Sequence, residues 1–191
     1  LLVENIGGPS VKPYQPPGLG KELNGTDLEL DHGEKLFRRS LYTFWKRTNP
    51  QPTMTAFDAP TGDATCTRRP RSNSPLAALT SLNEPIFVEA AQAMAQRVLR
   101  EGGKSDADRI DYAFRLCTSR RPNASEREAV GQLLSSRREK LARGELKAGE
   151  IAFSPFAKAS ELPPDVTPNE IAAWAVVSRV LLNLDETVAK N

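Results

Sequence analysis

Prolines are concentrated in the first half of this chain, and they limit where regular structure can form. Ten of the 15 prolines lie within residues 1–85. Proline fixes the backbone φ angle and lacks the N–H donor that helix interiors and central strands need. Gly7-Gly8-Pro9 and Pro13-Tyr14-Gln15-Pro16-Pro17-Gly18 are turn and extended-chain signals within this region. The first 30 residues are therefore predicted to form an extended arm that lies across a surface.

Helix signals dominate the second half. Hydrophobic residues recur there at helical spacing, and polar residues that commonly cap helices precede each apolar run. The expected helix starts are Ser74 (followed by Pro75), Asn83, Ser105, Ser125 and Thr167 (followed by Pro168). Gly102-Gly103 and Gly144 are the expected ends of two of these helices. Five amphipathic helices are therefore expected from residue 74 onward.

These patterns predict a mainly α fold, an irregular helical domain of about five helices with a long Pro-rich N-terminal arm. We expect an arm and basic loop region over residues 1–73 and a helical region over residues 74–191, together forming one folded unit. Residues 34–48 fit a helix or a strand equally well, so a short strand pair is left open. Residues 50–75 and 145–166 are expected to be irregular connections.

Charge is unevenly distributed, although the net charge is only +2. Residues 34–71 hold eight Lys or Arg against three Asp or Glu, and aromatic residues are interleaved with them. Guanidinium groups bind carboxylate, phosphate or sulfate in a bidentate manner, and aromatic rings stack on sugars or bases. The candidate ligand-binding residues are Arg38, Arg39, Tyr42, Trp45, Arg47, Asp58, Arg68 and Arg69.

Three interpretations of this segment remain open. It could bind an anionic or sulfated polysaccharide, or it could bind single-stranded nucleic acid, although the near-neutral net charge argues against the latter. Alternatively, its arginines pin the long loop internally through Asp58 and Glu89. Asp58 itself is either an acid or base of a polysaccharide-degrading enzyme or a residue that caps a turn.

The residues needed for many catalytic and metal sites are missing. The chain has one histidine, His32, and two cysteines, Cys66 and Cys117, which do not form a metal-binding motif. No catalytic triad motif or phosphate-binding glycine loop is present. We therefore predict no catalytic residues, no metal and no cofactor in this segment, and no stretch is long and apolar enough to span a membrane. Cys117 fits a core thiol and Cys66 an accessible one, while a disulfide between them is left open.

A family resemblance rests on motifs that run along most of the chain. They are Gly7-Gly8-Pro9-Ser10, Arg38-Arg39-Ser40-Leu41-Tyr42-Thr43-Phe44-Trp45-Lys46-Arg47, Phe57-Asp58-Ala59-Pro60, Leu82-Asn83-Glu84-Pro85 and Leu181-Leu182-Asn183-Leu184-Asp185-Glu186. The chain resembles the C-terminal planctomycete-specific domain of unknown function, which occurs in large proteins that often carry a planctomycete-type cytochrome c domain. Two positions depart from the family pattern, which often has Arg-Glu in place of Gly62-Asp63 and a glutamine in place of Ala77 or Ala78.

The resemblance implies a location and partners without implying an activity. It implies export to the periplasm or cell surface. The partners it implies are the N-terminal part of the same protein and a cytochrome c domain of the parent. The N-terminal part is expected to be missing here, because the resemblance covers only the latter part of the family domain. Any haem would be held elsewhere in the parent, since no Cys-x-x-Cys-His motif occurs here.

The leading prediction is a non-catalytic helical interaction module, which should expose an apolar patch along one face. Binding of an anionic or sulfated glycan, or a part in a polysaccharide-degrading enzyme, is the alternative. Glycan binding requires at least three basic side chains to converge on one groove. It fails if each of these side chains is paired to an internal acid or carbonyl.

Overall fold

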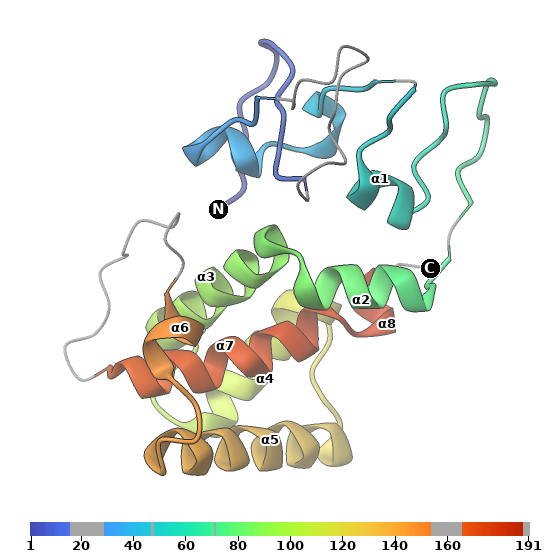
Figure 1. Cartoon of the computed structure of the whole chain (residues 1–191). Coiled ribbons are helices and arrows are strands. Elements are labelled where there is room, and N and C mark those ends of the chain that lie inside the picture. The colour runs from blue at the N-terminus through green and yellow to red at the C-terminus, as the bar shows by residue number, and fades with distance from the viewer. Residues whose placement is uncertain (16–28, 47, 71, 154–165, 189–191) are drawn as a thin grey trace. The chain divides into compact units, whose positions relative to one another are not determined.

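The computed structural model describes residues 1–15, 29–46, 48–70, 72–153 and 166–188. The chain divides into two compact units, Leu1–Ile86 (unit 1) and Phe87–Asn191 (unit 2). The described part is mainly helical, as predicted, and it contains no β-strand (Figure 1). The expected boundary after residue 73 and the expectation of one folded unit stay predictions.

Unit 1 contains two α-helices and two turns of 3₁₀-helix. The α-helices are α1 (Pro52–Ala56) and α2 (Pro75–Asn83), and the 3₁₀-helices are Gly33–Phe37 and Ser40–Tyr42. The N-terminal arm runs beside the 3₁₀-helices and pairs with them at two isolated parallel bridges, Val3 with Arg38 and Val11 with Thr43. Helix and strand were left open for residues 34–48; within that segment, residues 34–43 form 3₁₀ turns and single bridging residues.

Unit 1 buries few side chains. Among its described residues, Val11, Gln51, Ala77 and Ser81 are buried, and two of these are polar. Gln51 caps α1 by accepting a hydrogen bond from the Met54 backbone N–H at 2.8 Å. Because so little apolar surface is removed from water, hydrogen bonds to the main chain carry much of the tertiary structure of this unit.

Unit 2 is a helical bundle built around one central helix. Its helices are α3 (Pro85–Glu101, which begins at the end of unit 1), α4 (Asp106–Thr118), α5 (Ala124–Ala142), α6 (Ala148–Ala152), α7 (Pro168–Leu182) and α8 (Asp185–Val188). Helix α7 packs against α4, α5, α6 and α8. Trp174 of α7 is the largest fully buried side chain, and its indole Nε1 donates to Glu170 Oε1 at 3.0 Å.

Most helix starts agree with the sequence prediction. Ser74, Ser105 and Thr167 each accept a hydrogen bond from a backbone N–H of the first turn of the helix that follows. Two starts were assigned to the wrong residue. The cap of α5 is Asn123, which forms a capping box with Glu126, so Ser125 lies inside the first turn. Asn83 ends α2 and its side chain donates to the Leu79 carbonyl, so it does not cap α3.

Three short helices were not predicted. Helices α1 and α6 fall in segments expected to be irregular, and α8 follows a break at Asn183 in what was expected to be one continuous helix. The five longer helices correspond to the five expected ones. Residues 154–165 of the expected connection lie outside the described residues.

The two cysteines lie in different environments, and both are free thiols. Cys117 is buried in the core of unit 2, as predicted, and burial raises its pKa to about 11. Cys66 is exposed. Among the described residues, no helix is both long enough and apolar enough to cross a membrane.

Candidate functional site

The predicted basic segment begins with a clamp made by Arg38 and Tyr42. The Arg38 guanidinium lies 3.6 Å from the centre of the Tyr42 ring. Its Nη2 donates to the carbonyls of Asn5 at 3.0 Å and Gly7 at 2.6 Å, and its Nη1 donates to Pro9 at 3.0 Å. The Gly7 backbone N–H donates to the Tyr42 hydroxyl at 2.9 Å. Arg38 therefore fastens the N-terminal arm and uses its donors on backbone carbonyls.

The glycines of the arm make this clamp possible. Gly7 and Gly8 have φ values of 81° and 87°, a region that residues with a Cβ rarely adopt. The chain turns at these two residues, and the backbone carbonyls of Asn5, Gly7 and Pro9 all accept hydrogen bonds from the Arg38 guanidinium. The sequence signal Gly7-Gly8-Pro9 therefore encodes the docking point of the arm.

Arg69 and Asp58 are brought together in the loop that follows α1. Arg69 donates from Nε to the Asp58 carbonyl at 3.0 Å and from Nη2 to the Phe57 carbonyl. The Asp58 carboxylate accepts from the backbone N–H of Ser72 at 2.8 Å and from its hydroxyl at 2.7 Å. These hydrogen bonds hold the pKa of Asp58 below its usual value. The contacts match the interpretation in which the loop is fastened internally, with Asp58 ordering a turn.

The remaining predicted site residues do not join these contacts. Arg39 and Arg68 are exposed, and their side chains make no hydrogen bond or ion pair with other described residues. Arg47 lies outside the described residues. Trp45 packs over Gly62, where an added Cβ would lie 3.2 Å from the indole Nε1. A larger residue at this position would require Trp45 to shift.

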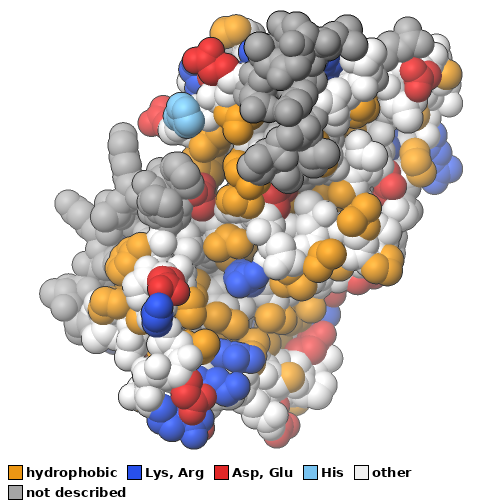
Figure 2. Space-filling model, viewed as in Figure 1, with side chains coloured by type: hydrophobic (Ala, Val, Ile, Leu, Met, Phe, Trp, Pro, Cys, Tyr) orange, Lys and Arg blue, Asp and Glu red, His pale blue; other side chains and the backbone are white. Residues whose placement is uncertain are grey.

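A groove that the sequence did not suggest lies between α1 and α2. It has a volume of about 370 Å³, and we call it the α1–α2 groove. Its lining residues are Tyr14, Pro52, Thr53, Ala56, Leu76, Leu79, Thr80, Asn83, Glu84 and Pro85. Leu76 and Leu79, one turn apart on α2, are 61% and 59% exposed. Hydrophobic side chains are visible on the surface of α2 in Figure 2. The groove therefore offers apolar surface to solvent.

Glu84 supplies the one charged side chain of the α1–α2 groove. Its Oε1 accepts a hydrogen bond from the Thr53 hydroxyl at 2.7 Å. Its Oε2 is buried and has no hydrogen-bond partner among the described residues. Burial raises the pKa of Glu84, and the Thr53 hydrogen bond offsets this rise only in part. The Glu84 carboxyl group therefore has a hydrogen-bond donor for one of its oxygens and none for the other.

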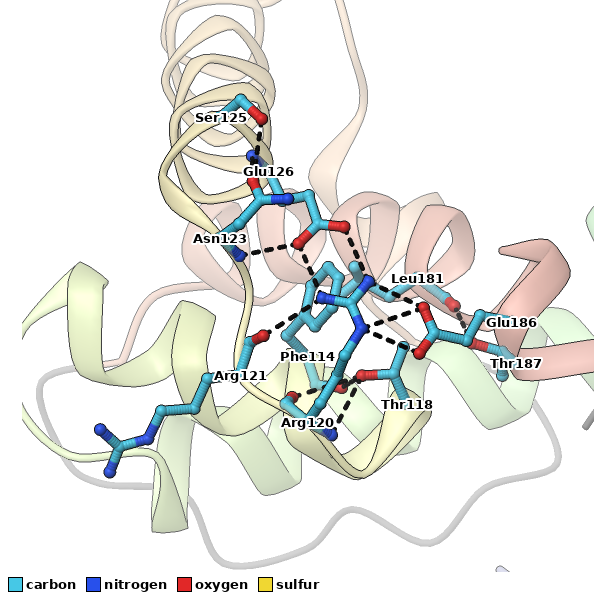
Figure 3. A network of polar contacts seen from close by, with 10 residues as sticks. All are labelled: Phe114, Thr118, Arg120, Arg121, Asn123, Ser125, Glu126, Leu181, Glu186 and Thr187. Carbon is cyan, nitrogen blue, oxygen red and sulfur yellow. Dashed lines mark hydrogen bonds and ion pairs between the residues drawn. The ribbon is translucent and has the colours of Figure 1, made fainter.

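A second polar constellation surrounds Arg120 in unit 2 (Figure 3). Arg120 Nη1 and Nη2 donate to Glu126 at 2.9 and 2.8 Å, and Nε and Nη2 donate to Glu186 at 2.9 and 2.8 Å. Nη1 also donates to the Arg121 carbonyl at 3.2 Å, so all five N–H donors of the guanidinium are used. The guanidinium lies 5.0 Å from the centre of the Phe114 ring.

The Arg120 network borders a hollow of about 430 Å³ between α4, α5, α7 and α8. Its apolar lining is Phe114, Ala129, Val130, Leu133, Val180, Leu181 and Leu184. Because Arg120 has no free donor, it offers nothing to an incoming anion. The network instead ties the capping box of α5 to α8, and hydrogen bonds from Arg120 hold the pKa of Glu126 at about 2.

Neither the α1–α2 groove with Glu84 nor the Arg120 network resembles a catalytic site. No group of three or more His, Cys, Asp or Glu residues suited to a metal ion occurs among the described residues. His32 is exposed and lies just before the first 3₁₀-helix. Sequence reasoning missed Glu84 because its environment is set by Thr53, 31 positions earlier. It missed Arg120 because the two glutamates lie 6 and 66 positions away.

Comparison with known proteins places the chain in a family without assigning an activity. The model of the PSD1 family, described as a protein of unknown function (DUF1553), matches residues 1–134. No curated protein and no solved structure matches the chain significantly. The expected family of unknown function is thereby confirmed, while restriction to planctomycetes and a C-terminal position in the parent stay predictions. With 134 of its 191 residues matched, the chain belongs to the PSD1 family of proteins of unknown function (DUF1553).

Proposed function

We propose that this chain is a non-catalytic helical interaction module of a large exported protein. Its α1–α2 groove docks another domain of the same polypeptide, either the N-terminal part or a cytochrome c domain. The observation that carries this proposal is the exposure of Leu76 and Leu79 beside the groove, at 61% and 59%. Export and the identity of the partner domains rest on the family resemblance.

The energetics of the two leucines support docking. Burying a leucine side chain that was exposed contributes about 1.5–3 kcal/mol. Two such residues one helical turn apart form the kind of pattern by which a helix face meets a partner. The groove beside them gives a partner side chain a place to insert. A central anchor surrounded by less important contacts is the usual energetic layout of protein interfaces.

The polar groups of unit 1 are already engaged, which supports a non-catalytic role. The carboxylate of Asp58 accepts two hydrogen bonds from Ser72, and its lowered pKa keeps it ionised at neutral pH. An ionised carboxylate cannot serve as the general acid of glycoside cleavage. Arg38 and Arg69 are bound to backbone carbonyls.

Glycan binding remains the second candidate because Arg39 and Arg68 are exposed and make no ion pair with other described residues. Two of the five arginines named as candidates for such a site, Arg38 and Arg69, are used internally. An anionic glycan would have to rely on the others. Direct titration with a sulfated glycan separates this candidate from docking, since Arg39→Ala/Arg68→Ala would weaken glycan binding and leave domain docking unchanged.

The test of docking is calorimetric titration of this chain with each of the other domains of its parent, produced as separate proteins. We expect one domain to bind with saturation and one-to-one stoichiometry. The variant Leu76→Gln/Leu79→Gln should weaken that binding by at least about tenfold, because two apolar contacts are lost. Glutamine keeps helix propensity close to that of leucine. Absence of binding by every domain, or equal binding by the variant, would overturn the proposal.

A further inference from the structure

We propose that the α1–α2 groove selects a basic side chain, arginine or lysine, flanked by apolar residues, and that Glu84 is the selecting residue. This inference rests on the proposed function, because the docked domain supplies the side chain. It states which kind of side chain anchors that domain in the groove.

The first step of the argument is the incomplete hydrogen bonding of Glu84. Thr53 satisfies Oε1, but Oε2 is buried without a partner among the described residues. A buried polar atom without a partner destabilises a fold, and more so when the group is charged. Natural structures keep few such atoms, and each calls for an explanation. A ligand group that donates a hydrogen bond would remove this cost.

The second step is the charge of the groove. Of the ten lining residues, Glu84 is the one with a carboxyl group, and no Lys or Arg lines the groove. The only influences on the pKa of Glu84 are burial, which raises it, and the Thr53 hydrogen bond. No cation of the described chain therefore compensates this carboxyl group. A partner cation would find an unpaired carboxylate in surroundings of low polarity, where charge-assisted hydrogen bonds are strongest.

The third step is the match between the groove and the shape of a basic side chain. Lysine and arginine have long apolar stems that pack on hydrophobic surface while the charged end reaches a polar partner. Leu76, Leu79, Pro52 and Ala56 provide that surface, and Glu84 lies among them. The charged end of such a side chain would therefore meet the Glu84 carboxyl group at the wall of the groove.

The test uses two peptides of nearly the same shape, one with a charged guanidinium group and one with a neutral ureido group. The probes are acetyl-Leu-Arg-Leu-amide and acetyl-Leu-citrulline-Leu-amide, titrated against the whole chain by NMR. The methyl signals of Leu76 and Leu79 and the carboxyl carbon of Glu84 report binding. We expect the arginine peptide to bind at least about tenfold more tightly, and its binding to lower the pKa of Glu84. The preference should disappear in Glu84→Gln, which keeps the size of the side chain and removes its charge.

The outcomes separate this inference from the function on which it rests. Equal binding of both peptides, lost in Leu76→Gln/Leu79→Gln, would overturn selection by Glu84 and retain apolar docking. An arginine preference that persists in Glu84→Gln would also overturn the inference, because the charge would then be recognised elsewhere. If neither peptide binds at several millimolar, the inference fails, while the domain titration still decides the proposed function.

Discussion

The two units of the chain both use arginine to hold their parts together, but they direct it at different groups. In unit 1, Arg38 and Arg69 donate to backbone carbonyls of the arm and the loop. In unit 2, Arg120 and Arg138 donate to carboxylates on separate helices, and Arg138 joins Asp106 of α4 to Glu170 of α7. Unit 2 has a core that surrounds Trp174, whereas four described residues of unit 1 are buried.

This difference shows how a segment with little core can still have a defined structure. In unit 2, packing fixes the helices and the ion pairs join their ends. In unit 1, turns and extended segments leave carbonyls unpaired, and arginine supplies several donors from one side chain. The same scarcity of core leaves Leu76 and Leu79 exposed. Unit 1, which packs less, therefore offers two exposed leucines beside a groove to a partner.

Removal of Trp174 should have the largest effect. Trp174→Ala deletes a fully buried ring and its hydrogen bond to Glu170, and should lower the free energy of unfolding of unit 2 by about 3–5 kcal/mol. Denaturant unfolding followed by circular dichroism measures this change. Trp174→Phe, which keeps a ring in the core, is the control and should cost clearly less. Equal losses in both variants would mean that the hydrogen bond matters more than the packing.

Removal of the Arg38 clamp should have an intermediate effect that stays within unit 1. Arg38→Ala eliminates three hydrogen bonds to the arm and the contact with Tyr42, and should cost about 1–2 kcal/mol. Amide hydrogen exchange at Val3 and Val11, whose N–H groups bond across to the 3₁₀ segments, should accelerate. Arg39→Ala is the matched control and should leave exchange unchanged. If exchange were unchanged in Arg38→Ala, Arg38 would not be what holds the N-terminal arm in place.

Replacement of Arg120 should change the pKa of Glu126 more than it changes the fold. Glu126 has a pKa of about 2 because of Arg120, so its contribution to stability is present above pH 4.5 and is lost as the pH falls toward 2. In Arg120→Ala the pKa of Glu126 should rise toward 4.5, measured by NMR titration. Arg115→Ala, which removes an arginine near the end of α4, is the control and should leave it near 2. A Glu126 pKa unaffected by Arg120→Ala would contradict the network in Figure 3.

Local signals predicted the helices, because a cap or a breaker acts within a few residues. Thr167 followed by Pro168 predicted the start of α7, and Gly102-Gly103 predicted the end of α3. The start of α5 was misassigned because Asn123 with Glu126 and Ser125 with Glu128 both fit a capping pattern. Such ambiguity is resolved by the direction from which the chain enters the helix, which a local pattern does not contain.

The sites were harder to predict because they depend on residues far apart in sequence. The composition of the basic segment suggested several uses for its arginines, and only the fold places the Asn5 and Gly7 carbonyls beside Arg38. Glu84 was seen in the sequence as part of a family motif, but its burial and its contact with Thr53 are tertiary features. Sequence periodicity on α2 could not show that its leucines remain exposed.

The measurement that tests the central claim most directly is the free energy of unfolding of two single variants, Leu76→Gln and Leu79→Gln. If the two leucines serve a partner and not the fold, each substitution should change this free energy by no more than about 0.5 kcal/mol, as is usual at exposed positions. A loss of about 2 kcal/mol or more for either residue would place it in a core. That result would contradict the account, because the α1–α2 groove would then have no spare apolar surface with which to dock.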